Sequence, residues 1–595
     1  MKDYDMQLTQ VAALLKAAVQ QLSAIEVTVD FERPKQCDFG DAASSVALVT
    51  FSRLTAESKA QLGVNSPLVL AQLIVKSIDK KALSCLGIEK IEAVAPGFIN
   101  LTWQDRIKWT SILNLLEAKA GRYVDLGRDQ TVVIDYSSPN IAKPFTIGHL
   151  RSTIIGDSVA NLLSASGYRV VRDNHLGDWG TQFGKQIVAI KRWGDLDKIS
   201  ASQTPVKELV DLYVRFHEEV ENDPSLNDEA RAVFKQLEDG DPEVRAIWQR
   251  CVDLSMVEFN KIYARLGVSP FDITLGESFA EPYVPEVVKI LEKKGLLQDS
   301  KGAKVVFFPE QSKLPPMIVI KDDGATIYAT RDLAIDHYKL QNYGQDIIEI
   351  TEVGAEQNLY FRQLIATEEA LGWFKSGKRL HLSHGLYRFK DRKMSTRKGD
   401  VIWLSDILDE AHRLVKKMSK ADLSHESIEA IAIGAIKWND LSREANKNID
   451  FDFTEILNVK GFSGPYVQYS LVRALAILQK ITASQMESVQ EILTLATEVL
   501  SKKSIQNLAE IKLDDDEREL VGLLTNYYQT IVRATSNYAP HLICDYLYNV
   551  ATSFNSFYAR GVILSDVKRE VLTAATAWVL EKGLAILGIK SLVKM

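Results

Sequence analysis

A chain of 595 residues is too long for one hydrophobic core, so we expect three or four domains. Its hydrophobic content of 46% and charged content of 25% are those of an ordinary globular protein. The net charge of −7 argues against a protein that coats nucleic acid indiscriminately, although a local basic surface can still contact phosphates.

The cysteines and the first residues bear on the cellular compartment. The four cysteines, Cys37, Cys85, Cys251 and Cys544, lie far apart and form no C-x-x-C pair, which argues against a disulfide framework or a cysteine-based zinc site. No apolar run reaches the length of a membrane span, and the start, MKDYDMQLTQ, lacks the layout of a secretion signal. We therefore expect a cytoplasmic protein without a membrane partner.

The first part of the chain, 1–122, mixes helix and strand signals. The stretch IEAVAPGFINLTW is strand-like. Near the start, apolar residues recur at helical spacing: Leu8, Val11, Leu14, Leu15, Val19 and Leu22. We expect a small α+β domain here.

Strand and helix signals alternate over 123–403, which predicts a parallel sheet with a ligand site at the carboxyl ends of its strands. The run from Thr131 to Asp135 is short, apolar and β-branched, so it predicts a buried strand. Apolar residues at helical spacing follow it and predict a helix that ends near Gly167: Leu150, Ile154, Ile155, Val159, Leu162 and Leu163. A polar, charged segment at about 195–265 predicts a helical insertion.

The remainder is almost wholly helical in pattern. We expect a helical connection over 404–460 and a helical bundle over 461–595. The acidic run DDDERE at 514–519 predicts the charged first turn of one of these helices.

The loop between the predicted strand and helix, SSPNIAKPFTIGHLRST at 137–153, suits an anionic ligand because free backbone N–H groups gather at the start of a helix. It matches neither the dinucleotide fingerprint nor the P-loop. Gly148 allows a nucleoside to approach the backbone, and His149 and Lys143 can stabilise charge that grows on a phosphate. Taken alone, the Gly-His pair is better explained as a purely structural turn.

A second basic element, DRKMSTRKGD at 391–400, is typical of a loop that folds over a nucleoside triphosphate. A similar string, KKMSK at 416–420, continues a helical stripe instead. That stripe (Ile407, Ala411, Leu414, Met418) predicts a buried Met418 with its neighbouring lysines in solvent.

Together, the Gly-His signature and the Lys-Met-Ser loop about 250 residues later resemble those of class I aminoacyl-tRNA synthetases. Longer segments narrow the resemblance to the bacterial type of arginyl-tRNA synthetase, in the expected order over essentially the whole chain. They are APGFINL, SSPNIAKPFTIGHLRSTIIGD, NHLGDWGTQFG, GESF, IYATRDLA and GFSGPYVQYSLVRA.

The resemblance implies a two-step arginine–tRNA ligase. Arginine and ATP form arginyl-adenylate and pyrophosphate, and the arginyl group then passes to the 3′-terminal adenosine of tRNA(Arg). In this family the first step generally needs bound tRNA. The implied fold is a Rossmann-type catalytic domain, an N-terminal domain that contacts the tRNA elbow, and a helical anticodon-binding domain. The resemblance further implies Mg²⁺ with the ATP, no zinc, and a monomer.

For arginine, the resemblance assigns Asp332 and Glu277 as the guanidinium-binding acids and Tyr328 as the aromatic beside them. Planar carboxylates suit a guanidinium, and two acidic partners for one guanidinium would exclude lysine and citrulline, because the wrong ligand leaves buried acids unpaired. Tyr328 and Asp332 are four residues apart, on one side of a helical turn. The α-amino and carboxylate end is assigned to Asn140 and Gln357, with Asp135 assisting.

For the nucleotide, the resemblance assigns catalytic roles to three residues and ATP contacts to an overlapping set. The catalytic residues are Lys143, His149 and Lys393, and the ATP-binding residues are Thr146, Gly148, His149, Met394, Ser395 and Lys398. The chain departs from the family pattern twice, because Thr146 replaces the first signature histidine and Thr396 the second lysine of the loop. A lysine upstream of the signature is thought to substitute for the latter, and here it is Lys143.

Residues with a proposed tRNA role are fewer. On the helix YLYNVATSFNSFY, the stripe of Tyr546, Val550, Phe554 and Phe557 predicts core packing. Tyr548, Asn555 and Tyr558 lie off that stripe and are candidates to contact an anticodon base. Asn100 resembles the family position at the tRNA elbow, although a strand-end asparagine would look the same. Asp178 and Trp179 fit a pocket-shaping or a purely structural role.

Two other functions stay open at this point. One is an enzyme of the same signature superfamily that activates a small molecule. The other is an inactive synthetase-like protein that binds arginine or RNA as a regulator. The helical C-terminal part argues against the first, and the presence of Lys143, His149, Lys393 and the acid pair argues against the second.

Overall fold

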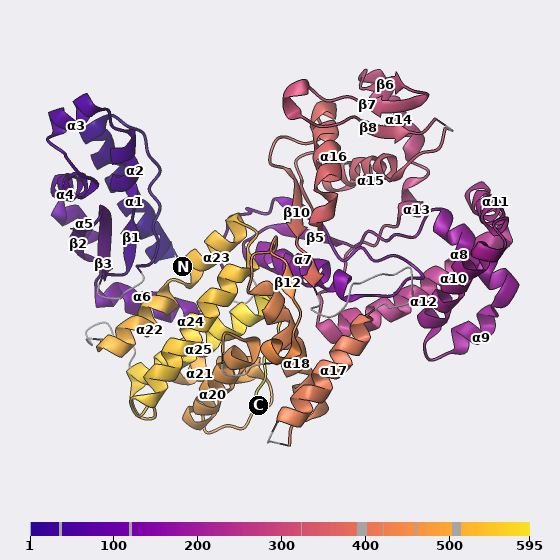
Figure 1. Ribbon diagram of the computed structural model, residues 1–595. Coiled ribbons are helices and arrows are strands. Elements are labelled where there is room, and N and C mark those ends of the chain that lie inside the picture. The colour runs from indigo at the N-terminus through magenta and orange to yellow at the C-terminus, as the bar shows by residue number, and fades with distance from the viewer. Residues whose placement is uncertain are drawn as a thin grey trace.

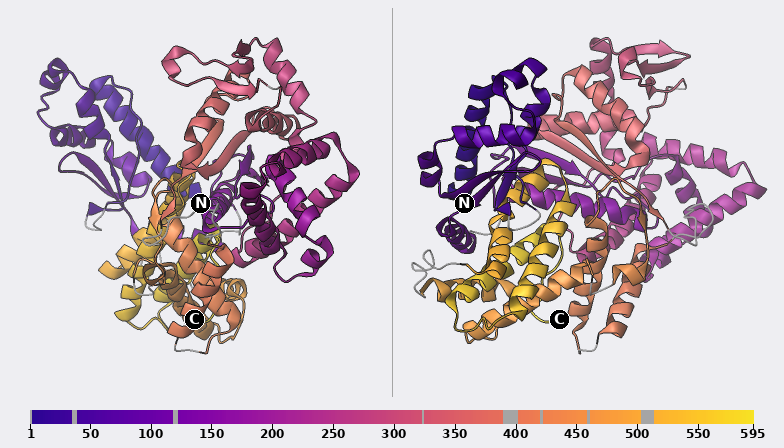
Figure 2. Two further views of the ribbon diagram at one scale, coloured as in Figure 1. Left: turned by 45° about the vertical axis from the view of Figure 1, so that its right-hand side comes forward. Right: turned by 60° about the vertical axis from the view of Figure 1, so that its left-hand side comes forward.

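The computed structural model contains three parts: an N-terminal domain, a central α/β part and a helical C-terminal part (Figure 1). It describes residues 2–34, 39–117, 122–322, 324–388, 402–419, 422–457, 461–502 and 513–595. The N-terminal domain and the lobe that contains α15 and α16 both rise from the helical part, with the N-terminal domain standing apart (Figures 1 and 2).

The N-terminal domain packs helices on a three-stranded antiparallel sheet of order β1-β3-β2. Leu8, Val11, Leu15 and Val19 of α1 are buried, as the helical spacing predicted. Its elements are α1 (Lys2–Ser23), β1 (Ala42–Ser44), α2 (Val46–Arg53), α3 (Ala56–Leu62), α4 (Pro67–Ser77), α5 (Lys80–Cys85), β2 (Ile88–Val94), β3 (Phe98–Trp103) and α6 (Asp105–Glu117).

A four-stranded sheet of order β10-β9-β4-β5 forms the centre of the molecule, and every neighbouring pair in it is parallel. Its strands and connecting helices are β4 (Thr131–Asp135), α7 (Ile147–Ala165), β5 (Arg169–Asp173), β9 (Ile348–Gly354), α16 (Asn358–Leu371) and β10 (Arg379–His384). Crossover helices bury both faces, which explains why β4 reads as a continuous apolar run. The carboxyl ends of these strands meet at one edge.

Two insertions interrupt this unit. The first is helical: α8 (Thr181–Trp193), α9 (Leu196–Ala201), α10 (Pro205–Asn222), α11 (Leu226–Asp239) and α12 (Pro242–Leu266). The second surrounds a small antiparallel sheet of order β6-β7-β8: α13 (Glu277–Ala280), α14 (Val284–Lys293), β6 (Leu297–Ser300), β7 (Ala303–Val306), η2 (Glu310–Ser312), β8 (Met317–Ile320) and α15 (Tyr328–Tyr343). Figure 1 shows them on either side of the strand ends. The short η3 (Ala355–Gln357) follows β9 and leads into α16.

The C-terminal part is helical, apart from the short parallel pair β11 (Tyr387–Arg388) and β12 (Ile449–Asp450). Asp514 and Glu517 form a reciprocal cap on α22, which confirms that the acidic run begins a helix. The helices are α17 (Leu404–Met418), α18 (His425–Leu441), α19 (Phe453–Ile456), α20 (Gly464–Ile481), α21 (Val489–Lys502), α22 (Asp515–Thr525), α23 (Tyr527–Ser536), α24 (Pro540–Ala559) and α25 (Val567–Ile586).

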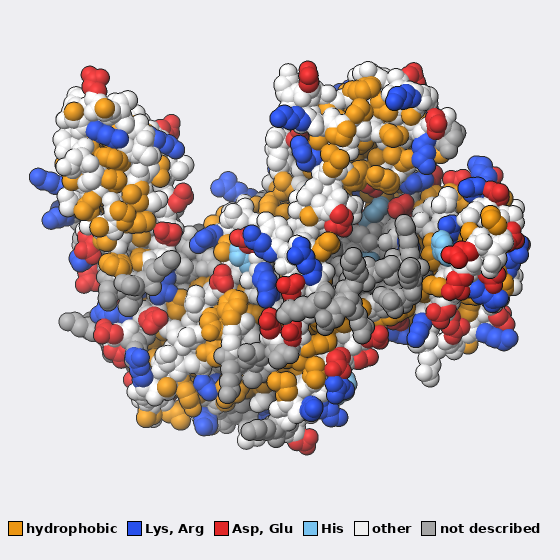
Figure 3. All heavy atoms as spheres, in the orientation of Figure 1, with side chains coloured by type: hydrophobic (Ala, Val, Ile, Leu, Met, Phe, Trp, Pro, Cys, Tyr) orange, Lys and Arg blue, Asp and Glu red, His pale blue; other side chains and the backbone are white. Residues whose placement is uncertain are grey.

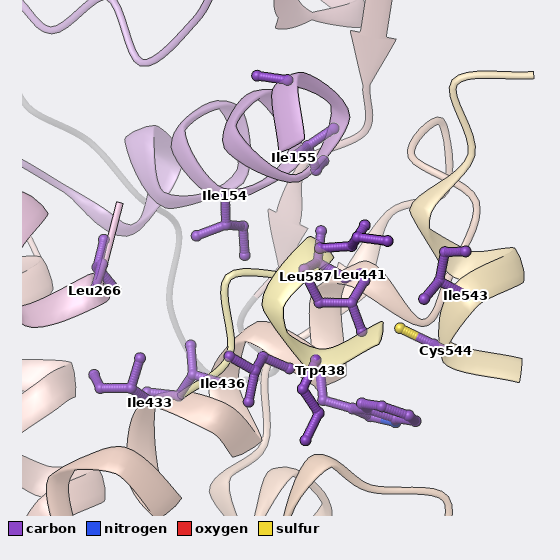
Figure 4. Packing of buried hydrophobic residues seen from close by; sticks show 14 of the residues in the cluster. Ile154, Ile155, Leu266, Ile433, Ile436, Trp438, Leu441, Ile543, Cys544 and Leu587 are labelled. Atoms are coloured by element: carbon purple, nitrogen blue, oxygen red, sulfur yellow. The ribbon is translucent and has the colours of Figure 1, made fainter. Parts of the chain in front are cut away.

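Hydrophobic packing joins the signature helix α7 to this bundle. Ile154 on α7, Trp438 on α18 and Leu587, just after α25, belong to one buried cluster (Figure 4). The whole arrangement confirms the predicted fold class: an α/β protein with a Rossmann-type parallel sheet, an N-terminal α+β domain and a C-terminal helical bundle. In the described part of the chain, no helix combines the length and the apolar content that crossing a bilayer requires.

A buried ionic cluster lies between α15 and the sheet. Lys339 Nζ is 2.9 Å from both Asp173 and Glu349, and Arg379 is 2.9 Å from Asp336. Arg379 Nε also lies 3.2 Å from Glu368. Burial alone would lower the pKa of Lys339, but the surrounding acids hold it well above its ordinary value. These acids therefore have cations supplied by the chain itself.

Candidate active site

The loop between β4 and α7 holds an unusual backbone in place with buried hydrogen bonds. Ser137, Ser138 and Ala142 have left-handed φ angles of 76°, 45° and 52°, which cost energy in residues other than glycine. Each donates its N–H to a side-chain acceptor: Ser152 Oγ at 2.9 Å, Asn174 Oδ1 at 3.2 Å and Ser255 Oγ at 3.0 Å, respectively. Neighbouring elements thus fix the loop that leads into the signature.

His149 lies in the first turn of α7 and is held as a neutral imidazole. The backbone N–H of Thr146 donates to His149 Nδ1 over 3.0 Å, so the ring proton of the neutral form is on Nε2. Burial lowers the pKa of His149 to about 4, and the charge of Lys143 adds to that effect. His149 can therefore donate a hydrogen bond from Nε2 without carrying charge.

Gly148 and Lys143 lie beside this histidine. Gly148 is exposed in the first turn of α7 and has no side chain, so the backbone at the start of the helix is accessible to a ligand. Lys143 is half-buried, and burial lowers its pKa, while the charge of Glu277 opposes that shift. The three predicted residues Lys143, Gly148 and His149 are thus at one end of the sheet.

Three extended segments join side by side beyond the strand ends. The N–H of Gly177 donates to Pro139 O over 3.1 Å, and the N–H of Leu176 donates to Leu275 O over 3.0 Å. A side chain at Gly177 would collide with the Asn140 amide, 2.5 Å away, so glycine is required there. This pairing places the neighbourhoods of Asn140 and Glu277 together, although 137 residues separate them.

The predicted guanidinium acids, Asp332 and Glu277, lie close enough for the charge of Asp332 to raise the pKa of Glu277. Tyr360 donates its hydroxyl to Asp332 Oδ2, and His175 Nε2 lies 3.7 Å from Asp332 Oδ1. Burial raises the pKa of Asp332, and burial also raises that of Glu277 to about 7, which His175 opposes and Asp332 increases. Within the described residues, the cation nearest to Glu277 is Arg331, at 4.0 Å, and Arg331 is bound more closely by Glu281, at 2.6 Å.

Tyr328 opens α15 one turn before Asp332 and is 53% exposed. Its ring meets the ring of Tyr360 edge to face, with centroids 4.8 Å apart. An exposed aromatic side chain beside two half-buried acids offers a flat surface to a guanidinium group. The spacing of Tyr328 and Asp332 in the sequence predicted this arrangement on one helical turn.

Two other residues predicted for arginine lie at strand ends. Asp135 ends β4 and accepts hydrogen bonds from Ser138 Oγ at 2.9 Å and from the N–H of His175 at 3.2 Å. Gln357 is exposed just after β9, the strand beside β4. Figure 3 shows histidine side chains in the hollow that these strand ends face, between the lobe of α15 and α16 and the helices of the first insertion.

Asp178 has a structural role in this pocket. Its carboxylate accepts the N–H of Ser278 at 2.9 Å and the Ser278 hydroxyl at 2.6 Å. Gly276 packs directly on that carboxylate, since a side chain there would lie 2.2 Å from it. Asp178 therefore fixes the start of α13, where Glu277 lies, while Trp179 is buried against Phe234 and Trp248.

The predicted basic loop lies outside the described residues, and so do Lys393, Met394, Ser395 and Lys398. Its flanks are described. Leu404 donates its N–H to Phe145 O over 2.9 Å, next to the signature. On the other side, Arg151 of α7 donates to Gly385 O at 2.8 Å and pairs with Asp440 at 3.1 Å. Both flanks are therefore attached to the signature helix or the residues before it.

Known protein families and relatives match this chain over nearly its whole length. Family models match three consecutive parts of the chain: "Arginyl tRNA synthetase N terminal domain" over 9–103, "tRNA synthetases class I (R), catalytic domain" over 111–453, and "DALR anticodon binding domain" over 467–595. The arginine–tRNA ligase of Streptococcus suis is 38% identical over 597 residues, covering 98% of this chain and 99% of the relative. That of Clostridium perfringens is 39% identical over 546 residues, covering 89% and 91%.

The chain belongs to the arginyl-tRNA synthetase family. Its fold is also similar to solved members. The Thermus thermophilus arginyl-tRNA synthetase has a TM-score of 0.78 at 20% identity, covering 99% of this chain and 100% of the other. The Plasmodium falciparum enzyme has a TM-score of 0.77 at 21% identity, covering 99% of both chains.

The residues that the synthetase resemblance links to tRNA occupy different environments. Asn100 is buried, 4% exposed, and donates to Phe39 O over 2.8 Å. Asn555 donates to Tyr466 and Ser470 and accepts a hydrogen bond from Arg473 over 2.5 Å. Asn555 is therefore committed to contacts within the helical part.

The two tyrosines predicted beside Asn555 lie nearer the surface. Tyr548 packs its ring against Phe462 and Tyr466, with centroids 4.9 and 5.4 Å away. Tyr558 is 43% exposed, and the guanidinium of Arg473 lies 4.9 Å from its ring. Tyr546, Val550, Phe554 and Phe557 are buried, as their stripe predicted.

One prediction is wrong. Met418 was expected on the buried stripe of its helix, but it is 55% exposed. Residues Ile407, Ala411 and Val415 of α17 are buried, whereas Met418 is the last residue of the helix, where α17 projects beyond its neighbours (Figure 1). The apolar residues of α17 keep their helical spacing up to Met418, although, among the described residues, the helix no longer packs against a neighbour there.

Two pocket residues of this synthetase were not found from the sequence. Tyr360 holds Asp332 from α16, 28 residues away, and no local pattern marks it. His175 does carry a signal, since it follows β5 directly and β5 is the neighbour of β4 in the sheet. Polar residues at the carboxyl ends of parallel strands are candidates for a ligand site.

Proposed function

We propose that this chain is an arginine–tRNA ligase that uses the described pocket for L-arginine and the start of α7 for ATP. The observation that carries the proposal is the pair of acids, Asp332 and Glu277, which face one pocket beside the signature helix. A guanidinium supplies the positive charge that these acids lack, and the family membership of the chain supports this ligand.

In the first step, an oxygen of the arginine carboxylate attacks the α-phosphorus of ATP. The bond to the bridging oxygen breaks, and pyrophosphate leaves with the electron pair. His149, as a neutral imidazole, donates a hydrogen bond from Nε2 to the phosphates of ATP, and the Lys143 ammonium balances negative charge on them. We assign ATP contacts to Thr146 and Gly148 as well, and Mg²⁺ accompanies the nucleotide through its phosphate oxygens.

In the second step, a hydroxyl of the 3′-terminal adenosine of tRNA(Arg) attacks the arginyl carbonyl carbon, and AMP leaves. The catalytic domain over 123–403 carries out both steps, and tRNA must be bound for the first. Asn140, Gln357 and Asp135 hold the α-amino and carboxylate end, and Lys393, Met394, Ser395 and Lys398 belong to the loop that covers ATP.

The outer parts hold the tRNA. Residues 1–122 contact the elbow and 461–595 the anticodon, with 404–460 connecting the bundle to the sheet. A groove of about 1600 Å³ lies between the N-terminal domain and the bundle. Its lining contains more acids than arginines (Asp30, Glu32, Asp125, Glu519 and Asp545 against Arg33 and Arg533), so the groove does not by itself support a path for phosphates. We expect a cytoplasmic monomer, in which Asn100, Tyr548, Asn555 and Tyr558 lie in or near these contacts.

The test is to charge purified tRNA with labelled arginine, with and without ATP. The proposal expects ATP-dependent charging. An enzyme that activates a small molecule would exchange pyrophosphate with ATP but leave tRNA uncharged, and a regulator would do neither while binding arginine or RNA. A folded protein that fails to charge tRNA with arginine contradicts the proposal. Pyrophosphate exchange with and without tRNA tests whether tRNA is needed for activation.

A further inference from the structure

His175 lies where acids from three parts of the fold converge. Its backbone N–H donates to Asp135 Oδ1 over 3.2 Å, and its ring Nε2 lies 3.7 Å from Asp332 Oδ1. The His175 side chain is 19% exposed and that of Asp332 is 22% exposed, so water screens this pair only in part. Since Tyr360 binds Oδ2 of Asp332, the imidazole faces the other oxygen.

The backbone of His175 is fixed on both sides. Asn174 donates its N–H to Ile273 O over 3.2 Å, and Leu176 donates its N–H to Leu275 O over 3.0 Å. The imidazole is therefore held at the pocket by the same pairing of segments that positions Glu277.

The charges around His175 favour its protonated form. Burial alone would lower its pKa, but Asp332, Asp135 and Asp173 together raise it, while Lys339 opposes them. His175 in turn lowers the pKa of Asp332 and of Glu277. The titratable and charged groups around the pocket are Asp135 on β4, Asp173 on β5, Asp178 in the paired segment, Glu277 on α13, Arg331, Asp332, Asp336 and Lys339 on α15, Tyr360 on α16 and Arg379 on β10.

We propose that His175 is the resident counter-ion of the guanidinium pocket: as an imidazolium it pairs with Asp332 while arginine is absent, and it gives up its proton when the guanidinium arrives. The inference rests on the proposed function, since it requires arginine as the ligand. The proton passes to solvent, so the pocket exchanges one positive charge for another. A cation within 4–6 Å shifts a neighbouring pKa by about one to three units, which is enough to discharge the ring near neutral pH.

The exchange makes the pocket selective for charge. A neutral isostere such as citrulline cannot replace the imidazolium, so the acids would keep His175 protonated. His175 thus acts as a positioning and specificity residue. Its imidazolium keeps Asp332 ionised in the empty pocket, and only a cationic ligand causes His175 to lose its proton.

Imidazole NMR of the full-length enzyme tests the inference. Selectively labelled histidines are titrated from pH 5.5 to 8.5 without ligand, with saturating arginine and with citrulline. The His175→Gln variant assigns the resonance of His175, and His381→Gln is a matched control, because His381 stacks on Phe361 at 4.5 Å and contacts no pocket acid. If His175→Gln fails to fold, assignment by paramagnetic relaxation from a spin-labelled surface cysteine replaces it.

We expect arginine to lower the apparent pKa of His175 by about one unit or more, and citrulline and the His381 signal to show no such change. An unchanged His175 pKa in a protein whose calorimetric titration shows arginine binding overturns this inference alone. A ring that is neutral throughout the titration without ligand also overturns it. If calorimetry with bound tRNA detects no arginine binding at all, the proposed function fails instead.

Discussion

Asp332 and Asp336 lie one helical turn apart on α15, and they differ in the groups that balance their charge. Asp336 pairs with Arg379 at 2.9 Å in the buried ionic cluster. Among the residues that the structure describes, the side chains that approach Asp332 are the Tyr360 hydroxyl and the His175 imidazole, the latter 3.7 Å away. The pKa values of these two acids differ in the same sense. Although burial works against it, Arg379 lowers the pKa of Asp336, while burial raises that of Asp332.

The difference indicates which acids serve the fold and which serve a ligand. An acid whose cation comes from the chain stabilises the folded state, and removal of either partner leaves a buried charge. An acid whose cation is missing weakens the empty protein and gains from a ligand that supplies the charge. Asp332 and Glu277 are of the second kind, and Asp336 and Asp173 are of the first.

The largest effect is expected for Asp332→Asn. The amide cannot pair with a guanidinium, so we expect kcat/KM for arginine in tRNA charging to fall by about 10³-fold or more, with little change in unfolding free energy. Asp336→Asn is the matched control on the same helix, and it should lower stability by about 3 kcal/mol. If both variants lost the same unfolding free energy and kept their activity with arginine, the proposed difference in role between Asp332 and Asp336 would be contradicted.

Lys339→Met tests the buried cluster from the side of its cation. Two carboxylates, Asp173 and Glu349, would lose a partner at 2.9 Å, so we expect urea denaturation to show a loss of about 3–5 kcal/mol. The comparison variant is Lys304→Met, since Lys304 is a partly exposed lysine 3.9 Å from Glu292 and Asp299, and it should change stability by less than about 1 kcal/mol. If Lys339→Met had the same unfolding free energy as the wild-type protein, the buried ionic cluster would not stabilise the fold as we expect.

On the nucleotide side, the ligand is negative and the chain supplies the cation. We expect Lys143→Ala to lower ATP–pyrophosphate exchange, measured with tRNA present, by about 10²-fold or more, because our proposal gives Lys143 the role of the loop lysine that is absent at Thr396. Lys191→Ala, at an exposed lysine paired with Glu243, should leave the rate unchanged. An undiminished exchange rate in Lys143→Ala would overturn this assignment.

The smallest effect concerns pH. With the pKa of Glu277 at about 7 in the empty pocket, arginine must displace a proton below that pH, so its KM should rise by up to about tenfold per unit as the pH falls from 7 to 6. A pKa raised above the ordinary value of 4.5 also means that stability is lost as pH rises from 4.5 through 7. Glu277→Gln should therefore stabilise the empty protein at pH 8 while raising KM. A KM that is flat from pH 6 to 8 would contradict a protonated Glu277.

Much of this site was predictable because its signals are local. The apolar run of β4 and the spacing of Leu150, Ile154 and Val159 predicted the strand and the helix that frame the signature. The four-residue spacing of Tyr328 and Asp332 placed both at the start of one helix. Each of these depends on a periodicity within a few turns of chain.

The rest depends on contacts between distant segments. His175 becomes a pocket residue only because β5 lies beside β4 and because Asp332 arrives from α15, 157 residues later. Asn555 was off the buried stripe, yet its amide is used by Arg473, Tyr466 and Ser470, which lie on α20. Met418 shows the converse error, because a helical period does not reveal where the neighbouring helix stops.

The central claim is that the pocket acids lack a permanent cation, because His175 can lose its proton, and that the arginine guanidinium supplies one. Calorimetric titration of the enzyme, with tRNA bound, compares arginine with citrulline, which has nearly the same shape and no charge. The account predicts that arginine binds about 10³-fold more tightly or better, and that Asp332→Asn removes most of this preference. Equal affinity for the two ligands in the folded wild-type enzyme would contradict it.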